Sequence, residues 1–161
     1  MADAPNATTD AAMVKQERRV RASKLGECKI EIKARSHTFY ADEPLKAGGT
    51  DEGPTPREIA LGALAACVTV ITGKVAKGMD FNVIDQSIEV RGTADPQGAK
   101  DADNGITPNF DHVEVKIRLV TDESDERVAE IKRQHFGRCP ISALFRSSSC
   151  ELVEEWTIER P

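Results

Sequence analysis

Six segments of the chain have the pattern expected of β-strands. In the clearest of them apolar and charged residues alternate, which is typical of strands that are covered on one face only. The strongest pattern is that of residues 112–121, where four apolar side chains share one face. It is predicted to pair as a hairpin with residues 83–93 across a long polar connection. The other strands are predicted at residues 20–22, 28–34, 37–41 and 152–159.

A long helix is predicted from Pro56 to about Lys77. Thr55 stands at the N-cap, Pro56 at the first helical position and Glu58 three residues after the cap. This arrangement is a capping box with proline at its favoured position. Gly78 is predicted to end the helix in the left-handed conformation.

The middle of this helix, residues 59–73, is apolar or small on every side. A helix that is apolar all round must be buried all round. Because one small domain cannot easily surround such a helix, we expect a second layer. That layer is either more of this chain or a partner subunit.

Two further helices complete the predicted elements. One runs from Ser124 to about Phe136, with acidic residues in its first turn and Gly137 just past its end. The other is a short helix that opens at Cys139-Pro140. Because strands cluster instead of alternating with helices, the order predicts an α+β fold.

The length of 161 residues corresponds to one domain, at roughly 150 residues per domain. Residues 1–16 are rich in Ala, Asp, Asn and Thr without periodicity, and are predicted to be a disordered tail. A single domain is therefore expected over residues 17–161.

Charge and composition narrow the classes of partner. The 22 basic and 27 acidic residues give a net charge of −5, which argues against nucleic acid, and seven aromatic residues are too few for a base-stacking platform. The longest uncharged run has fifteen residues, whereas a bilayer span needs about twenty. The chain begins without the basic start and apolar stretch of a secretory signal. A soluble, cytoplasmic protein that does not bind membranes is expected.

The cysteines and histidines do not have the spacing of a metal site. No pair of cysteines has the CxxC spacing, and the histidines form no HExxH motif. We therefore expect no metal and no other cofactor. The residues concerned are Cys28, Cys67, Cys139, Cys150, His37, His112 and His135.

Local chemistry favours Cys139 over Cys67 as a reactive thiol. Cys67 lies in the middle of the apolar helix, where burial should raise its pKa and a packing role is the simplest interpretation. Cys139 precedes Pro140 at a helix N-cap, where the positive helix end favours a thiolate. Cys28 and Cys150 are interpreted as packing residues.

Two motifs resemble the OsmC/Ohr family of thiol-dependent hydroperoxide reductases. The first is ADEPLKAGGTDEGPTPREIALGALAACVTV, residues 41–70, in which a DEP turn, a glycine-rich loop and a cysteine-bearing helix follow in the family's order. The second is CPISAL, residues 139–144, which matches the family's second cysteine. The resemblance covers about residues 28–160.

The resemblance implies an OsmC-like fold, with strands around a long buried central helix, in an intertwined homodimer. It implies that Cys67 is the peroxidatic cysteine and Cys139 the resolving one. The implied activity is reduction of organic hydroperoxides to alcohols through a Cys67 sulfenic acid and a Cys67–Cys139 disulfide. An external dithiol would then reduce the disulfide, in defence against oxidative or osmotic stress.

The chain departs from the Ohr branch at the residues that support the peroxidatic thiol. That branch has a glutamate directly after the helix proline, where this chain has Arg57, with Glu58 one residue later. Arg57 and Glu58 are therefore candidate supporting residues, although the capping box also explains Glu58. The Ohr arginine from the N-terminal strands has four candidates here, Arg18, Arg19, Arg21 and Arg35.

Two other functions compete with the peroxidase. The first is a non-catalytic dimeric scaffold or small-ligand-binding protein of the OsmC-like type, in which Cys67 only packs. The second is a cysteine hydrolase, which no Ser-His-Asp or Cys-His pattern in the sequence supports.

Overall fold

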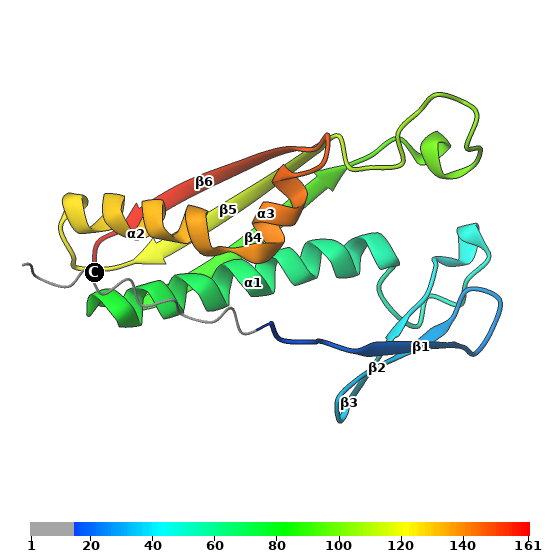
Figure 1. Cartoon of the computed structure of the whole chain (residues 1–161), viewed down its shortest axis with the longest axis horizontal. Coiled ribbons are helices and arrows are strands. Elements are labelled where there is room, and N and C mark those ends of the chain that lie inside the picture. The colour runs from blue at the N-terminus through cyan, green and yellow to red at the C-terminus, as the bar shows by residue number, and fades with distance from the viewer. Residues whose placement is uncertain (1–14) are drawn as a thin grey trace, which may run out of the picture. The chain divides into compact units, whose positions relative to one another are not determined.

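The computed structural model describes residues 15–161, so residues 1–14 of the predicted tail lie outside the described residues (Figure 1). The chain divides into two compact units that meet between Pro54 and Thr55. The single domain over residues 17–161 stays a prediction.

The first unit is built on a three-stranded antiparallel sheet. Its strands are β1 (Val20–Lys24), β2 (Ile30–Ala34) and β3 (His37–Ala41), in the order β1-β2-β3. The three strands predicted from the sequence are therefore confirmed. Arg35 takes the left-handed conformation in the turn between β2 and β3, with φ at 56°.

Asp42 organises the loop that follows β3. This side chain is 1% exposed, and its carboxylate accepts hydrogen bonds from the backbone N–H groups of Glu43, Thr50 and Glu52 at 2.8, 3.0 and 3.2 Å. The Thr50 hydroxyl donates a fourth bond at 2.5 Å. These bonds, with that of the hydroxyl the largest contribution, lower the pKa of Asp42 to about 2. Much of the predicted DEP and glycine-rich loop is thus folded around one buried carboxylate, with a short 3-10 turn at Leu45–Ala47.

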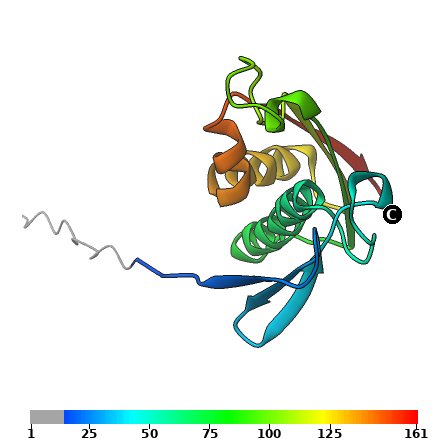
Figure 2. The same cartoon turned by 90° about the vertical axis from the view of Figure 1, so that its right-hand side faces the viewer.

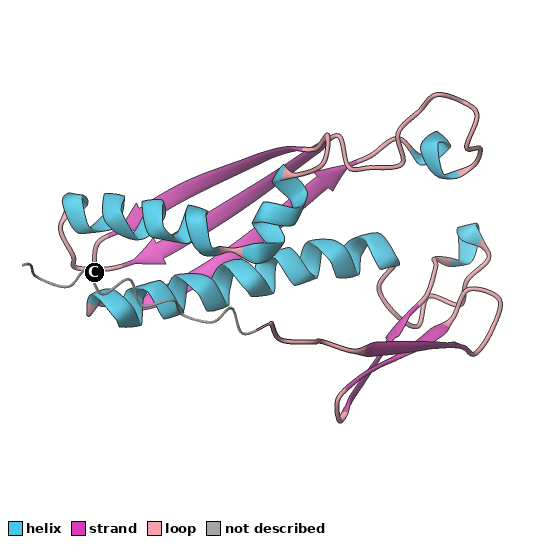
Figure 3. Ribbon diagram, in the orientation of Figure 1, coloured by secondary structure: helices cyan, strands magenta, loops and turns pink. Residues whose placement is uncertain are grey.

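The second unit places three helices on one side of a three-stranded sheet (Figures 1 and 2). The strands are β4 (Asp85–Thr93), β5 (His112–Val120) and β6 (Glu151–Glu159), in the order β4-β5-β6. β4 and β5 pair antiparallel, which confirms the predicted hairpin, and a 3-10 turn at Pro96–Ala99 lies in their connection. β5 and β6 pair parallel, so the chain crosses over between them through two helices. Figure 3 colours the helices cyan and the strands magenta.

The central strand β5 turns its apolar face into the core. Val113, Val115, Ile117 and Leu119 are at most 1% exposed, as the pattern of residues 112–121 predicts. With the two sheets and the helices in place, the α+β class is confirmed.

The long helix α1 (Pro56–Met79) begins as predicted and ends two residues later than predicted. Thr55 and Glu58 form the capping box, each side chain bonding the backbone N–H of the other residue. The predicted terminator is wrong, because Gly78 lies within the helix and Asp80 takes the left-handed conformation, with φ at 48°. Aspartate tolerates that conformation, so no glycine is needed there.

One face of α1 is buried and the opposite face is open in the single chain. Leu64, Val68, Thr72, Val75 and Ala76 are buried, whereas Val70 is 53% exposed. The predicted burial on all sides is thus not present in one chain. By length and composition alone, α1 is the one helix of residues 15–161 that could cross a membrane, and in this fold its buried side packs as a core helix.

The helix α2 (Asp125–Arg138) starts at the predicted N-cap, Ser124. Its predicted end is wrong, because Gly137 lies inside the helix and the last helical residue is Arg138. The chain leaves the helix at Cys139, since Pro140 disfavours helical geometry in the residue before it. The short helix α3 (Pro140–Arg146) follows directly, as predicted.

Candidate active site

The structure brings Cys67 and Cys139 together. The two sulfur atoms lie 3.4 Å apart, although the residues are 72 positions apart in the sequence. Cys67 is half-buried in the middle of α1, and Cys139 is 1% exposed at the junction of α2 and α3. Neither cysteine is in a disulfide.

The backbone at the helix junction fixes where Cys139 lies. Its N–H donates to the His135 carbonyl at 3.1 Å, and its carbonyl accepts from the Ala143 N–H at 3.0 Å. It is the N-cap of α3, as predicted, but its side chain makes no capping hydrogen bond. The sulfur therefore faces Cys67 instead of the end of its own helix.

The groups around the Cys67 thiol change its pKa in opposite directions. Burial has the largest effect, and it raises the pKa of Cys67 above its ordinary value, as predicted for this position. The Ile141 backbone N–H lowers the pKa, and so does the charge of Lys74, while the neighbouring Cys139 raises it. The Ile141 N–H at the start of α3 thus favours a thiolate at Cys67, whereas the sequence predicts that effect for Cys139.

An apolar cavity of about 390 Å³ lies between α1, α3 and the loop before β5, and neither Cys67 nor Cys139 is among its lining residues. Ile141 both lines this cavity and, through its backbone N–H, lowers the pKa of Cys67, which links the cavity to the thiol. The other lining residues are Arg57, Ala60, Ala63, Pro108, Asn109, Phe110, Leu144, Phe145, Ser148 and Cys150.

The two candidate supporting residues lie at the start of α1, whereas the Cys67 thiol lies in the middle of this helix. The Glu58 carboxylate accepts hydrogen bonds from the Thr55 N–H at 2.7 Å and the Thr55 hydroxyl at 3.0 Å, which lower its pKa. At 1.5 Å per residue, nine residues of helix separate it from Cys67 by roughly 14 Å along the axis. Arg57 lines the cavity and makes no ion pair within residues 15–161. Within one chain, neither side chain is brought to Cys67.

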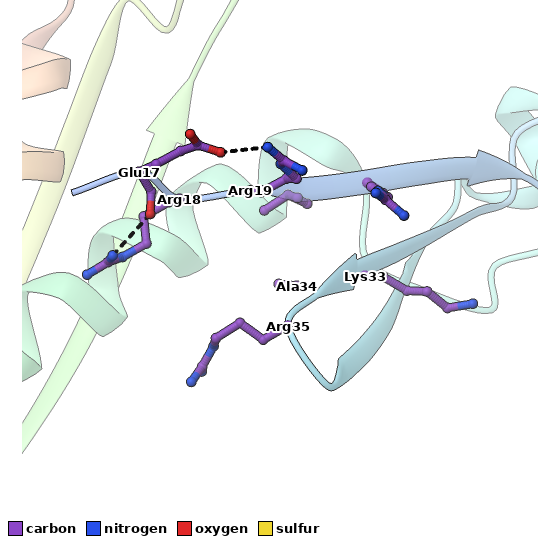
Figure 4. Close-up of a pocket in the computed structure, with 8 residues that line it drawn as sticks. Glu17, Arg18, Arg19, Lys33, Ala34 and Arg35 are labelled. Atoms are coloured by element: carbon purple, nitrogen blue, oxygen red, sulfur yellow. Dashed lines mark hydrogen bonds and ion pairs between the residues drawn. The ribbon is translucent and has the colours of Figure 1, made fainter.

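The four candidate arginines gather in the first unit. They line one pocket of about 940 Å³, together with Lys33 and Glu17 (Figure 4). Arg19 pairs with Glu17 at 2.9 Å, and Arg18 donates to the Gln16 side chain at 2.6 Å. That one of these four arginines acts on Cys67 stays a prediction.

The remaining cysteines differ in their surroundings. Cys28 is half-buried in the first unit. Cys150 is 8% exposed, and burial raises its pKa. It packs in the same hydrophobic cluster as Leu64 and Cys139, in agreement with a packing role. Residues 15–161 contain no group of three or more side chains that could hold a metal ion.

A buried polar network that the sequence does not predict lies behind Cys139. The Thr72 hydroxyl lies 3.1 Å from His135 Nδ1, and His135 Nε2 lies 3.7 Å from Glu154 Oε1. Hydroxyl, imidazole and carboxylate follow in the order of a nucleophilic triad, but Thr72 and His135 are 0% exposed, so no substrate can reach them. Residues 63 and 19 positions apart carry no spacing signal from which this network could have been predicted.

Solved structures with the same fold come from several bacteria. An OsmC-like protein from Mycoplasma pneumoniae has a TM-score of 0.77 at 16% identity, over 90% of this chain and 99% of that chain. An organic hydroperoxide resistance protein OsmC from Legionella pneumophila has a TM-score of 0.65 at 16% identity, over 90% and 99%. The organic hydroperoxide resistance protein OhrB of Bacillus subtilis has a TM-score of 0.58 at 20% identity, over 88% and 98%. At these identities the likeness shows the fold.

Among the curated proteins, none matches this chain significantly. The family model described as OsmC-like protein matches residues 49–153, which include α1, both cysteines of the close pair and the whole cavity lining. The chain therefore belongs to the OsmC-like protein family.

Proposed function

We propose that this protein is a cysteine peroxidase that reduces organic hydroperoxides to alcohols. The observation that carries the proposal is the pair of free thiols, with sulfurs 3.4 Å apart. Ile141, which acts on the Cys67 thiol, also lines an apolar cavity. In this proposal Cys67 is the peroxidatic residue and Cys139 the resolving one.

In the first step the Cys67 thiolate attacks the terminal oxygen of the hydroperoxide. The O–O bond breaks, the alkoxide takes a proton and leaves as an alcohol, and Cys67 becomes a sulfenic acid. The Ile141 N–H supports this step, because it lowers the pKa of Cys67 and so favours the thiolate. The apolar cavity wall suits the organic part of the substrate.

In the second step the Cys139 thiolate attacks the Cys67 sulfenic sulfur. The S–O bond breaks, the oxygen leaves as water, and a disulfide forms. A disulfide has its sulfurs about 2.05 Å apart, so the pair must close by about 1.3 Å from its 3.4 Å separation. An external dithiol then reduces the disulfide by thiol–disulfide exchange.

The single chain does not by itself give Cys67 the low pKa that a fast peroxidatic thiol needs. We infer that a homodimer completes the site and that one of the four N-terminal arginines supplies the positive charge. This inference leaves Arg57 and Glu58 as supporting residues whose contribution also depends on the dimer. A cytoplasmic location and a role in oxidative or osmotic stress belong to the same proposal.

Names of structural relatives agree with the proposal. The proteins from Legionella pneumophila, Bacillus subtilis and Elizabethkingia anophelis are each described as organic hydroperoxide resistance proteins.

The alternative is a non-catalytic dimeric OsmC-like protein that holds a small ligand in the cavity, with Cys67 as a packing residue.

The test is stoichiometric oxidation of the reduced protein by cumene hydroperoxide. One equivalent should consume two thiols and link Cys67 to Cys139, as read by peptide mass spectrometry. Cys67→Ser should abolish turnover with a dithiol, because serine supplies no anion at neutral pH. Cys139→Ser should react once and then stall as the sulfenic acid or overoxidise.

The control is Cys28→Ser, which should turn over within a few-fold of the wild type. Oxidation of Cys139 in the Cys67→Ser variant, with no first reaction in Cys139→Ser, would reverse the two roles. No thiol loss in the wild type at excess peroxide would favour the non-catalytic alternative.

A further inference from the structure

We propose that His135 is a positioning residue for Cys139. The buried network from Thr72 through His135 to Glu154 holds the last turn of α2, so that the Cys139 sulfur faces Cys67. This inference rests on the disulfide step of the proposed function, and it adds three residues that do not touch the reacting atoms.

His135 is the only buried residue in the last turn of α2. Phe136, Gly137 and Arg138 are all exposed, so they cannot anchor the turn by packing. Cys139 follows His135 by four residues and bonds its N–H to the His135 carbonyl at 3.1 Å. The place of Cys139 therefore follows from the place of His135.

Three residues from two elements hold the His135 ring. Thr72 of α1 bonds Nδ1, and the Trp156 ring of β6 packs edge-on, with centroids 5.5 Å apart and planes at 76°. Glu154 of β6 faces Nε2. Glu154 and Trp156 are two residues apart on a strand, so both side chains point to the same face of the sheet. The imidazole is thus held by α1 and by β6 together.

The bond to Thr72 ties α2 directly to the helix that carries the peroxidatic thiol. Thr72 is five residues after Cys67 on α1, about 7.5 Å along the helix axis. If α2 moved relative to α1, the Thr72–His135 bond would lengthen and Cys139 would move away from Cys67 at the same time. The Thr72–His135 contact therefore holds both its own distance and that between the two cysteines.

His135 Nε2 and Glu154 Oε1, which face each other at 3.7 Å, have no hydrogen-bond partner within residues 15–161. Buried polar groups without hydrogen bonds are costly, so each atom is best placed where it faces the other. This preference depends on the direction in which the polar atoms point, whereas apolar packing does not. It selects one orientation of the imidazole, and with it one position of the last turn of α2.

The test measures how well the folded protein places Cys139 at Cys67, without peroxide. The reduced protein is equilibrated with glutathione, in which one oxidised glutathione and two protein thiols give one protein disulfide and two reduced glutathiones. The equilibrium constant is the effective concentration of Cys139 at Cys67. His135→Leu should lower it at least tenfold, since misplacement by about 1 Å can cost a factor of about 100.

Two further variants separate positioning from bulk stability. Thr72→Val keeps the shape of the side chain and should also lower the constant, whether or not His135→Leu folds. His135→Asn, whose amide can still meet the Thr72 hydroxyl, should restore part of the loss. The matched control is Ile131→Val, one turn earlier on α2 and also fully buried, which should lower the melting temperature but leave the constant within twofold.

A wild-type constant in folded Thr72→Val, or an equal loss in Ile131→Val, would overturn the proposal. Because no peroxide enters the measurement, the result stands apart from the peroxidase assay. A protein that fails to reduce hydroperoxides but shows the expected series would sink the proposed function and keep the positioning role.

Discussion

The sulfurs of Cys67 and Cys139 lie 3.4 Å apart, and the backbone N–H of Ile141, two residues past Cys139, acts on the same Cys67 thiol. The CPIS segment therefore influences Cys67 in two ways. Cys139 raises the pKa of Cys67, and the Ile141 N–H lowers it. Lys74 contributes a positive charge, which also lowers this pKa.

Lys74→Gln should slow the reaction of Cys67 with iodoacetamide at pH 8 by about twofold, the size expected for an exposed charge. The lysine lowers the pKa of Cys67, so its loss raises that pKa and leaves less thiolate at pH 8. The two rates should converge once the pH exceeds both pKa values. Lys116→Gln is the control, because Lys116 lies on the face of β5 that points away from the helices, and it should not change the rate. Equal rates for Lys74→Gln and the wild type at pH 8 would show that the lysine charge does not reach Cys67.

Thr55→Ala should destabilise the protein by about 1 kcal/mol, because it removes the N-cap of α1. Glu58→Gln should destabilise it less, since an amide oxygen can still accept from the Thr55 N–H. If Glu58 acts only through the cap, Glu58→Gln should lower hydroperoxide turnover no more than Thr55→Ala does. Chemical denaturation and turnover assays on both variants give the comparison. A larger loss of turnover in Glu58→Gln would assign its carboxylate a direct role at the thiol.

The elements that local patterns specify could be predicted from the sequence. The strand at residues 112–121 follows from its period of two, and the start of α1 follows from Thr55 and Glu58 within four positions. The ends of α1 and α2 could not be predicted, because Gly78 and Gly137 stay helical. A glycine permits a left-handed terminator but does not require one.

The candidate site could be predicted in part. The two cysteine motifs nominate Cys67 and Cys139, but their separation depends on how α2 packs against α1. His135, which the sequence places near Cys139 and outside any metal motif, turns out to be the buried anchor of that packing. Its partners Thr72 and Glu154 come from other elements, so only the tertiary structure could identify them.

Asp42→Asn should loosen the loop that precedes α1 and make it less sensitive to acid. The pKa of Asp42 is about 2 in the folded protein and 3.8 ordinarily, so its stabilising effect is present above about pH 4 and is lost as the pH falls towards 2. The protection of the Thr50 and Glu52 amides, whose N–H groups bond Asp42, against hydrogen exchange should fall over that window in the wild type. In Asp42→Asn the two amides should exchange faster at neutral pH, with no such window. Unchanged protection in the variant would contradict the assigned role of Asp42.

The exposed face of α1 predicts a homodimer. Val70 is 53% exposed in the single chain, and small residues surround it on that face, namely Gly62, Ala63, Ala66, Thr69 and Gly73. An apolar helix face of this kind is costly to leave in water, and a second copy of the helix can cover it. Light scattering at micromolar concentration should therefore give a dimer.

Two substitutions on this helix should then fail in different ways. Leu64 is fully buried against the sheet, so Leu64→Asp should yield no folded protein, because an unpaired buried charge costs several kcal/mol. Val70→Asp should yield a folded monomer, because only the subunit contact is disturbed. Ile84→Asp, at a residue 50% exposed outside α1, should remain a dimer. A wild-type monomer with a cooperative melt, or a Val70→Asp variant that stays dimeric, would mean that a second copy does not cover this face.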